Sequence, residues 1–275
     1  MLRMIVTILS LIGIAYLLYG ALFYLNQRRI IFPGRRAGGR IEWLQPSEPA
    51  EQMWFEEDSN RVEAWLLPPY HPENHDPFPL AVIAHGNAAL IDYWFTQTEG
   101  LRQRGIGALL VEFPGYGRSS GEPSQDSIRK LFIQAYDAVT ARPEIDTSRI
   151  LFIGRSLGGG VVCDLAKYRH TNGIILISTF TGIRAYATNY LLPGFLVRDH
   201  YDNIAALKQF PRPVIVIHAP NDETVPYSHG LQLVQAAQQG ELITLPGGGH
   251  NHCIPDWEAL WQELEPFLRK VGMIE

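Results

Sequence analysis

The sequence predicts an α/β fold in which helices flank a mostly parallel central sheet, with an N-terminal transmembrane helix before it. Beyond residue 80, short apolar runs alternate with longer amphipathic segments. Near-continuous apolar runs are typical of strands buried on both faces, and their alternation with helices is typical of parallel sheets. An uncharged run opens the chain, and a Gly-x-Ser-x-Gly motif follows one of the apolar runs. These features set the expected positions of the anchor, the sheet and the site.

The first element is an apolar segment, Met4 to Leu25, which contains 22 residues and no charge. As a helix it would extend roughly 33 Å, enough to cross a hydrocarbon core of about 30 Å. Tyr16, Tyr19 and Tyr24 lie toward its C-terminal end, where aromatic residues favour the membrane interface. We expect an uncleaved anchor over residues 1–26. A cleaved signal peptide and a buried core helix are the alternatives.

The arginines around this segment are unevenly distributed. Arg3 precedes it, whereas Arg28, Arg29, Arg35 and Arg36 follow it. Positive charge is retained on the cytoplasmic side, so the count favours a single-pass protein whose following domain is cytoplasmic.

The remaining residues, 27–275, are expected to form one domain, a usual size for an α/β fold. A short strand is predicted at 29–33, and a hairpin at 52–57 and 61–67 with a turn at Asp58-Ser59-Asn60. The other predicted strands are 80–84, 108–113, 150–153, 174–177, 214–217 and 242–245. The predicted helices are 91–104, 124–140, 157–168, 227–238 and 255–271. Sites in such folds collect at the carboxyl ends of the strands.

Composition excludes some classes of function. The net charge is −5, so no broad positive field is available for nucleic acid. Two cysteines, Cys163 and Cys253, cannot make a disulfide framework.

The motif Gly154-Arg155-Ser156-Leu157-Gly158 lies between the predicted strand 150–153 and the predicted helix 157–168. A tight strand-to-helix turn of this kind lifts the serine hydroxyl above the sheet edge, and glycine is needed where a side chain would collide with nearby backbone. Ser156 is therefore the predicted nucleophile. The alternative is an ordinary strand-to-helix turn that contains Gly and Ser and has no catalytic role.

A serine hydroxyl needs a base, and a histidine held by a carboxylate is the usual one. His250 follows the strand 242–245 and a glycine run, with His252 as the fallback. His218 is expected to be a satisfied buried histidine, and His229 a solvated one on a helix.

The carboxylate should follow the preceding strand, 214–217. Asp222 is the predicted partner of His250, and Glu223 is its rival; either could instead cap the next helix.

Two backbone N–H groups are expected to form an oxyanion hole, one from Leu157 and one from Asn87 in the loop after strand 80–84. A plain β-to-α turn is the alternative for Asn87. His250, His252 and Cys253 lack a convincing fourth ligand and match no common zinc spacing, so no metal is expected. Catalysis by a serine, a histidine and a carboxylate requires no cofactor.

With these residues in view, the chain resembles the α/β-hydrolase superfamily, and in particular its membrane-tethered, Bem46-like branch. The resemblance runs from about Gln27 to the C-terminus. Its motifs, in order, are Arg29-Ile30-Ile31-Phe32-Pro33, His85-Gly86-Asn87, Phe113-Pro114-Gly115-Tyr116-Gly117-Arg118-Ser119-Ser120-Gly121, Gly154-Arg155-Ser156-Leu157-Gly158-Gly159, Asp222-Glu223-Thr224-Val225-Pro226 and Gly247-Gly248-Gly249-His250.

The resemblance implies an α/β-hydrolase fold that hydrolyses an ester, thioester or amide through an acyl-enzyme, with a variable helical cap at about 179–206. The cap is rich in apolar residues, which favours an acyl or lipid-like substrate beside a membrane; the alternative is that they simply pack on the domain. The expected function is that of a serine esterase or thioesterase. A membrane peptidase and a non-catalytic scaffold on the same fold are the other hypotheses.

Overall fold

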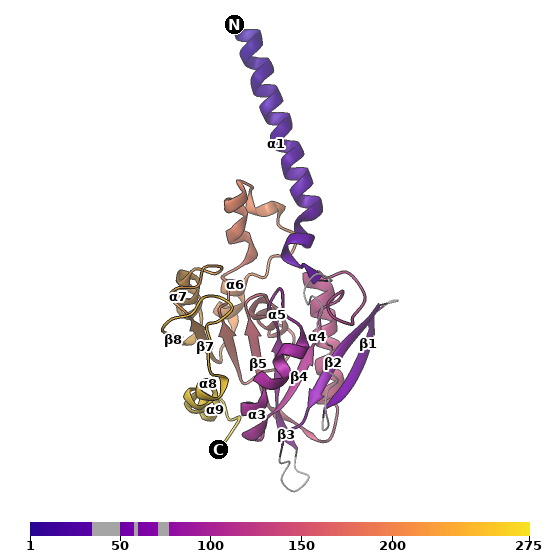
Figure 1. The fold of residues 1–275 in the computed structure, drawn as a ribbon, viewed down its shortest axis with the longest axis vertical. Helices are drawn as coiled ribbons and strands as arrows, with labels where there is room; N and C mark the ends of the chain where they lie inside the picture. Colours follow the sequence, from indigo (N-terminus) through magenta and orange to yellow (C-terminus); the bar gives the residue numbers. More distant parts are fainter. Residues whose placement is uncertain (35–49, 58–59, 71–76) are drawn as a thin grey trace.

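A computed structural model describes residues 1–34, 50–57, 60–70 and 77–275. Its centre is an eight-stranded sheet in the order β1-β2-β4-β3-β5-β6-β7-β8 (Figure 1). The strands are β1 Glu51–Glu57, β2 Asn60–Leu67, β3 Phe78–Ala84, β4 Gly107–Val111, β5 Ile145–Arg155, β6 Gly173–Ile177, β7 Pro213–His218 and β8 Gln239–Thr244. β2 runs antiparallel to both neighbours, and the other pairs are parallel. The predicted fold class is confirmed.

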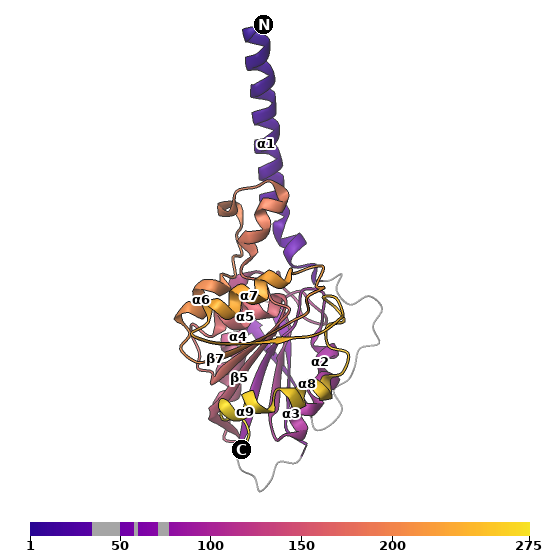
Figure 2. The ribbon, with the colours of Figure 1, turned by 90° about the vertical axis from the view of Figure 1, so that its left-hand side faces the viewer.

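Helices cover both faces of the sheet (Figure 2). One apolar core includes Leu80 and Val82 of β3, and the other includes Ala81 and Ile83 of the same strand. Alternate residues of one strand thus enter opposite cores, which explains its continuous apolar run. The helices are α2 Trp94–Gln97, α3 Glu99–Gln103, α4 Gln125–Thr140, α5 Leu157–Leu165, α6 Asn203–Gln209, α7 Tyr227–Ala236, α8 Trp257–Glu263 and α9 Glu265–Lys270.

The predicted hairpin is present as β1 and β2, which pair from Glu51 with Leu66 to Glu57 with Asn60. Two residues of its predicted turn, Asp58 and Ser59, lie outside the described residues.

The strand predicted at 29–33 is wrong, because helix α1 runs from Leu2 to Ile31. Its last turn carries Arg28 and Arg29, whose positive charges favour the C-terminal end of a helix. The helix ends where Pro33 forces the preceding residue away from helical geometry: Phe32 has φ −124° and ψ 84°.

Two predicted helices are broken. The segment 91–104 contains a 3₁₀ turn, η3 (Ile91–Tyr93), followed by α2 and α3, and the segment 255–271 divides into α8 and α9 at Leu264. Both lie against the same face of the sheet, and Trp261 donates through Nε1 to the carbonyl of Gln97. Tertiary packing therefore overrides the continuous helical period. Helix α6 was not predicted.

The segment between β6 and α6 rises from the domain as a cap that contains the 3₁₀ helices η4 (Ile183–Tyr190) and η5 (Gly194–Leu196). It lies beside α1 in both side views (Figures 1 and 2). Buried Gln27 of α1 donates to the carbonyl of Leu196 at 2.9 Å and accepts from the N–H of Arg198 at 2.8 Å. Arg28 forms an ion pair with Asp199 at 2.8 Å. The end of α1 is thus held against the cap.

Candidate active site

Ser156 lies at the turn between β5 and α5, at the carboxyl edge of the sheet. Its backbone has φ 52° and ψ −115°, a region that costs a residue with a side chain about 1–3 kcal/mol. A Cβ on Gly154 would lie 2.4 Å from the carbonyl oxygen of Gly158, and one on Gly158 would lie 1.9 Å from that of Ala84. Both glycines of the motif are therefore sterically required, as the sequence predicts.

This backbone strain leads to a stability prediction. Ser156→Gly and Ser156→Ala both remove the hydroxyl, but only glycine adopts this backbone without strain. We expect Ser156→Gly to have a free energy of unfolding about 1 kcal/mol above that of Ser156→Ala, after allowing for the greater freedom of glycine in the unfolded chain. Chemical denaturation of the two variants in the same detergent measures the difference. Equal stabilities would mean that the elbow is relaxed.

The structure brings Ser156, His250 and Asp222 into one row. His250 Nε2 lies 3.0 Å from Ser156 Oγ, and His250 Nδ1 lies 2.8 Å from Asp222 Oδ2. His250 and Asp222 are buried. The distances fit a hydroxyl that donates to a neutral imidazole whose other N–H donates to a carboxylate.

Asp222 is buried, and burial by itself raises the pKa of a carboxyl. Its Oδ1 accepts from the N–H groups of Val225 at 2.7 Å and Thr224 at 2.9 Å. Together with the contact to His250, these donors outweigh burial and hold the pKa of Asp222 below its usual range. Asp222 is therefore ionised at neutral pH and available to orient the imidazole.

The rival residues have other contacts. Glu223 is exposed, and its Oε2 accepts from the backbone N–H of His250 at 3.0 Å. It thus supports the loop that carries His250, whereas Asp222 contacts the ring. His252 is exposed on that loop.

His218 is buried as predicted, and its Nε2 donates to the carbonyl of Val225 at 2.8 Å. Its Nδ1 has no partner among the described residues, so it is not fully satisfied. The prediction of a solvated His229 is wrong. That side chain is half-buried, contacts Thr181 Oγ1 at 2.9 Å through Nδ1 and stacks on Tyr186. Burial lowers the pKa of both histidines.

The loop His85-Gly86-Asn87 lies against the elbow: a Cβ on Gly86 would lie 3.6 Å from Ser156 Cβ. His85 is buried, with Nδ1 2.8 Å from the carbonyl of Gly86 and Nε2 2.6 Å from Glu112 Oε1. Glu112 also accepts from the N–H of Phe113. Glu112, which directly follows β4 and holds the loop through His85, was not predicted from the sequence.

A cavity of about 360 Å³ opens beside Ser156, within the size range of small-molecule sites. Apolar and uncharged polar residues line it: Phe23, Gln27, Ile30, Ile31, Asn87, Ser156, Leu157, Phe180, Ile183, Tyr186, Ala187, Asn189, Tyr190, Val197, Thr224 and Val225. Asn87 and Leu157, the predicted oxyanion donors, are both in this wall. The four α1 residues were not predicted to belong to the site.

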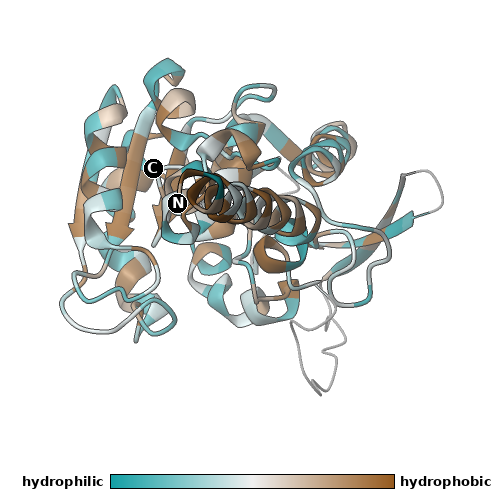
Figure 3. Ribbon diagram, turned by 90° about the horizontal axis from the view of Figure 1, so that it is seen from above, coloured by the Kyte–Doolittle hydropathy of each residue, from teal (hydrophilic) through white to brown (hydrophobic). Residues whose placement is uncertain are grey.

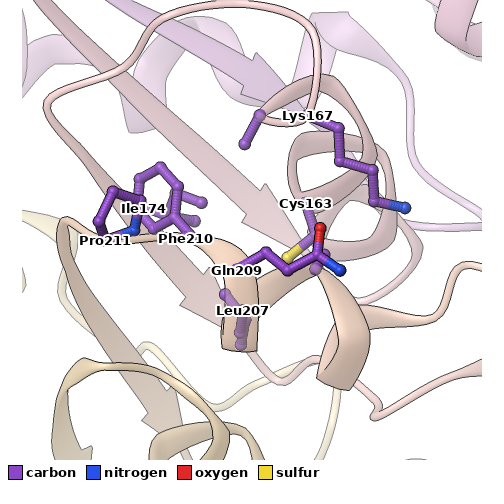
Figure 4. Close-up of a pocket in the computed structure, with 9 residues that line it drawn as sticks. Cys163, Lys167, Ile174, Leu207, Gln209, Phe210 and Pro211 are labelled. Carbon is purple, nitrogen blue, oxygen red and sulfur yellow. The ribbon is translucent and has the colours of Figure 1, made fainter.

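A second cavity, of about 220 Å³, lies between α5 and α6 and shares no lining residue with the first (Figure 4). It contains Cys163, and burial raises the pKa of this thiol to about 12. A protonated thiol is a poor nucleophile, so this cavity offers no competing nucleophilic cysteine.

The sheet order and the strained serine at a strand–helix turn define an α/β-hydrolase. A family described as "Serine aminopeptidase, S33" matches residues 75–200. The alpha/beta hydrolase domain-containing protein WAV2 of Arabidopsis thaliana is 30% identical over 246 residues, which cover 80% of this chain and 79% of that protein. The uncharacterized protein Rv2307c of Mycobacterium tuberculosis is 28% identical over 98% of this chain and 96% of its own length. The chain belongs to the α/β-hydrolase superfamily and is a hydrolase.

Solved structures show the same fold at low sequence identity. Est1E from Butyrivibrio proteoclasticus, solved with ferulic acid bound, has a TM-score of 0.65 and 19% identity, covering 80% of this chain and 99% of that one. The esterase domain of a Rhodothermus marinus protein has a TM-score of 0.62 and 20% identity, covering 81% and 99%. Neither alignment covers the whole of the present chain.

Proposed function

We propose that the chain is a membrane-anchored serine hydrolase that cleaves acyl esters or thioesters through Ser156, His250 and Asp222. The observation that carries the proposal is the hydrogen-bonded row from Ser156 through His250 to Asp222, placed at the wall of an apolar cavity.

In the proposed mechanism, His250 Nε2 takes the Ser156 proton while Oγ attacks the acyl carbonyl. Asp222 orients the ring and stabilises its charged form. The imidazolium then gives the proton to the leaving oxygen or sulfur, and the acyl group stays on Ser156 until water, deprotonated by His250, hydrolyses the acyl-enzyme. No cofactor takes part.

The oxyanion formed in each step is assigned to the backbone N–H groups of Asn87 and Leu157. Leu157 is the first residue of α5, and the first N–H groups of a helix have no partner within it. Asn87 approaches from the loop that His85 and Glu112 hold in place. Two such donors stabilise a tetrahedral intermediate by several kcal/mol.

The cavity supports an acyl substrate. Its wall is mostly aliphatic and aromatic, as a hydrocarbon chain requires. A serine peptidase, the class named by the matching family, is the second candidate. Recognition of a free amine favours a carboxylate, and the described residues of this wall include neither Asp nor Glu. We therefore place esters and thioesters ahead of peptides.

We assign residues 1–26 to a single-pass anchor and residues 27–275 to the hydrolase domain, with the cap at about 179–206. Helix α1 is long and apolar enough to span a membrane. Gln27 and Arg28 bind the cap, and Phe23 lines the cavity. Cleavage as a signal peptide would remove part of that wall, so these contacts support an uncleaved helix. The arginine bias favours a cytoplasmic domain.

The test is labelling of the membrane fraction with a fluorophosphonate probe, which reacts with an activated serine. We expect the wild-type protein to be labelled and the Ser156→Ala variant to remain unlabelled. Ser228→Ala, which alters an exposed serine on α7, is the matched control and should label as wild type does. A folded wild type that resists the probe would support the scaffold hypothesis instead. Labelled protein in the soluble fraction would contradict the anchor.

A further inference from the structure

The cap ends in a segment, here called the cap tip (Tyr190–Leu196), that exposes large apolar side chains. Leu191 is 80% exposed and Phe195 is 78% exposed. We propose that the cap tip inserts into the lipid leaflet that holds α1, so that the Ser156 cavity receives an acyl chain directly from the bilayer. This inference rests on the membrane anchor of the proposed function and adds a second contact with the membrane.

The position of the cap tip along α1 supports insertion. Tyr16 Oη donates to the carbonyl of Leu191 at 2.8 Å, and Tyr19 Oη donates to that of Tyr190 at 2.9 Å. Tyr16 lies nine residues before Leu25, the end of the apolar run, which is about 14 Å along a helix. The cap tip therefore reaches the level of the bilayer if α1 crosses it. Interfacial segments bury apolar groups about 5–10 Å deep.

Several backbone groups of the cap tip are paired, as an apolar medium requires. An unpaired backbone group in hydrocarbon costs several kcal/mol. The carbonyls of Tyr190 and Leu191 are paired by the tyrosine hydroxyls of α1, and that of Leu196 by Gln27. The N–H of Leu192 donates to the carbonyl of Ala187 at 3.1 Å. Polar side chains of α1 thus pair these carbonyls of the cap tip, while Leu191 and Phe195 face outward and Leu192 is buried.

The backbone of Leu191 gives an independent indication. It is left-handed, with φ 54°, a conformation that favours Gly or Asn and is unusual for Leu. Because the Leu191 side chain is exposed, leucine at this strained position does not stabilise the fold by packing. Burial of that side chain in lipid supplies the missing reason for an apolar residue.

The residues around the cap tip indicate where the membrane interface crosses α1. Viewed from above, α1 is apolar in colour along most of its length (Figure 3). The Arg198 guanidinium lies 5.4 Å from the ring centre of Tyr24, and arginine and tyrosine are typical of the interface. This pair lies on the domain side of the Tyr16 and Tyr19 contacts. The interface at Tyr24 therefore places the cap tip on the lipid side.

Insertion would connect the bilayer to the site. Tyr190 belongs to the cap tip and also lines the Ser156 cavity, where its ring is 4.9 Å from that of Phe23 of α1. A groove of about 540 Å³ lies along the flank where α1 meets the cap tip, and Leu17, Leu192 and Phe195 are among its lining residues. The substrate class indicated is a bilayer-resident acyl ester whose scissile bond lies near the headgroup level.

The experiment is a depth measurement on the full chain in phosphatidylcholine vesicles. Phe195→Cys is labelled with an environment-sensitive fluorophore; the native Cys163 and Cys253 are buried and should react slowly. Tyr168→Cys is the control, because Tyr168 is 50% exposed and follows the C-terminal end of α5, at the opposite edge of the sheet from Ser156. The fluorophore is challenged with lipid-borne nitroxide and with aqueous iodide.

We expect the fluorophore at 195 to be quenched by the lipid-borne nitroxide and shielded from iodide, and the one at 168 to behave in the opposite way. Equal iodide quenching at both positions would overturn the proposal. Shielding at 195 that vanishes on dilution of protein in lipid would assign the cap tip to a second copy and would also overturn it. The readout requires no turnover, so its failure is distinct from a failure of fluorophosphonate labelling.

Discussion

Replacing Ser156 by alanine is expected to lower kcat/KM for an acyl ester by about 10⁴–10⁶-fold, because the attacking oxygen is removed. The His250 and Asp222 side chains would remain hydrogen-bonded to each other, so the fold and the cavity should persist. A panel of chromogenic acyl esters of increasing chain length, in detergent, measures the loss. The apolar cavity predicts that wild-type kcat/KM rises with chain length until the cavity is filled.

A double variant tests whether Ser156 and His250 act as one unit. His250→Ala alone is expected to cost about as much as Ser156→Ala, and the double variant little more than either, because the base has no role without the hydroxyl. Losses that multiply would show that the two residues act independently and would contradict the proposed mechanism. An intact oxyanion site should leave residual hydrolysis above that of water alone in all three variants.

The elbow could be predicted from the sequence because its constraints are local. The spacing of Gly154, Ser156 and Gly158 is fixed by contacts within one turn and with the adjacent strand, and an apolar strand precedes it. The loop residues Asp222 and His250 follow neighbouring strands β7 and β8. Parallel strands place their carboxyl ends at one edge, so chain order predicts that these two loops meet the elbow, although it does not choose between Asp222 and Glu223 or between His250 and His252.

The wall of the cavity could not be predicted in the same way. Phe23, Gln27, Ile30 and Ile31 belong to a segment whose apolar composition already has an explanation as a membrane span. Their contact with the cap joins residues about 170 positions apart, such as Arg28 and Asp199, and no local pattern encodes it. The strand predicted at 29–33 was wrong for a local reason. The three apolar residues Ile30, Ile31 and Phe32 before Pro33 fit a strand or a helix end equally well.

His229 and Glu112 illustrate a related difficulty for single residues. A histidine on a surface helix is expected to be solvated, yet the cap folds back and places Thr181 and Tyr186 against this one. Glu112 follows a buried strand and carries no motif of its own, and its partner His85 lies 27 positions earlier. Burial and pairing of this kind depend on tertiary contacts, which determine the environment that a polar side chain meets.

Asp222→Asn is the second substitution with a large expected effect. An amide in place of the carboxylate can donate to His250 Nδ1 and so favours the tautomer whose Nε2 carries a proton, which cannot accept the Ser156 proton. A loss of about 10⁴-fold in kcat is expected at neutral pH, from the wrong tautomer and from the missing charge. Steady-state hydrolysis of the same esters measures it.

Glu223→Gln is the matched control, since it neutralises the adjacent carboxylate. Glu223 contacts the backbone N–H of His250 at 3.0 Å, and a glutamine carbonyl oxygen can still accept there. The expected loss is below about tenfold, because a neutral acceptor forms a weaker hydrogen bond than a charged one but keeps the loop in place.

A larger loss for Glu223→Gln than for Asp222→Asn would make Glu223 the functional acid. The Asp222 contacts to the Thr224 and Val225 amides would then serve only to shape the loop. Comparable losses from the two substitutions would mean that the combined negative charge near His250 matters more than the orientation of its ring. In that case the Asp222 carboxylate alone would not determine the tautomer of His250.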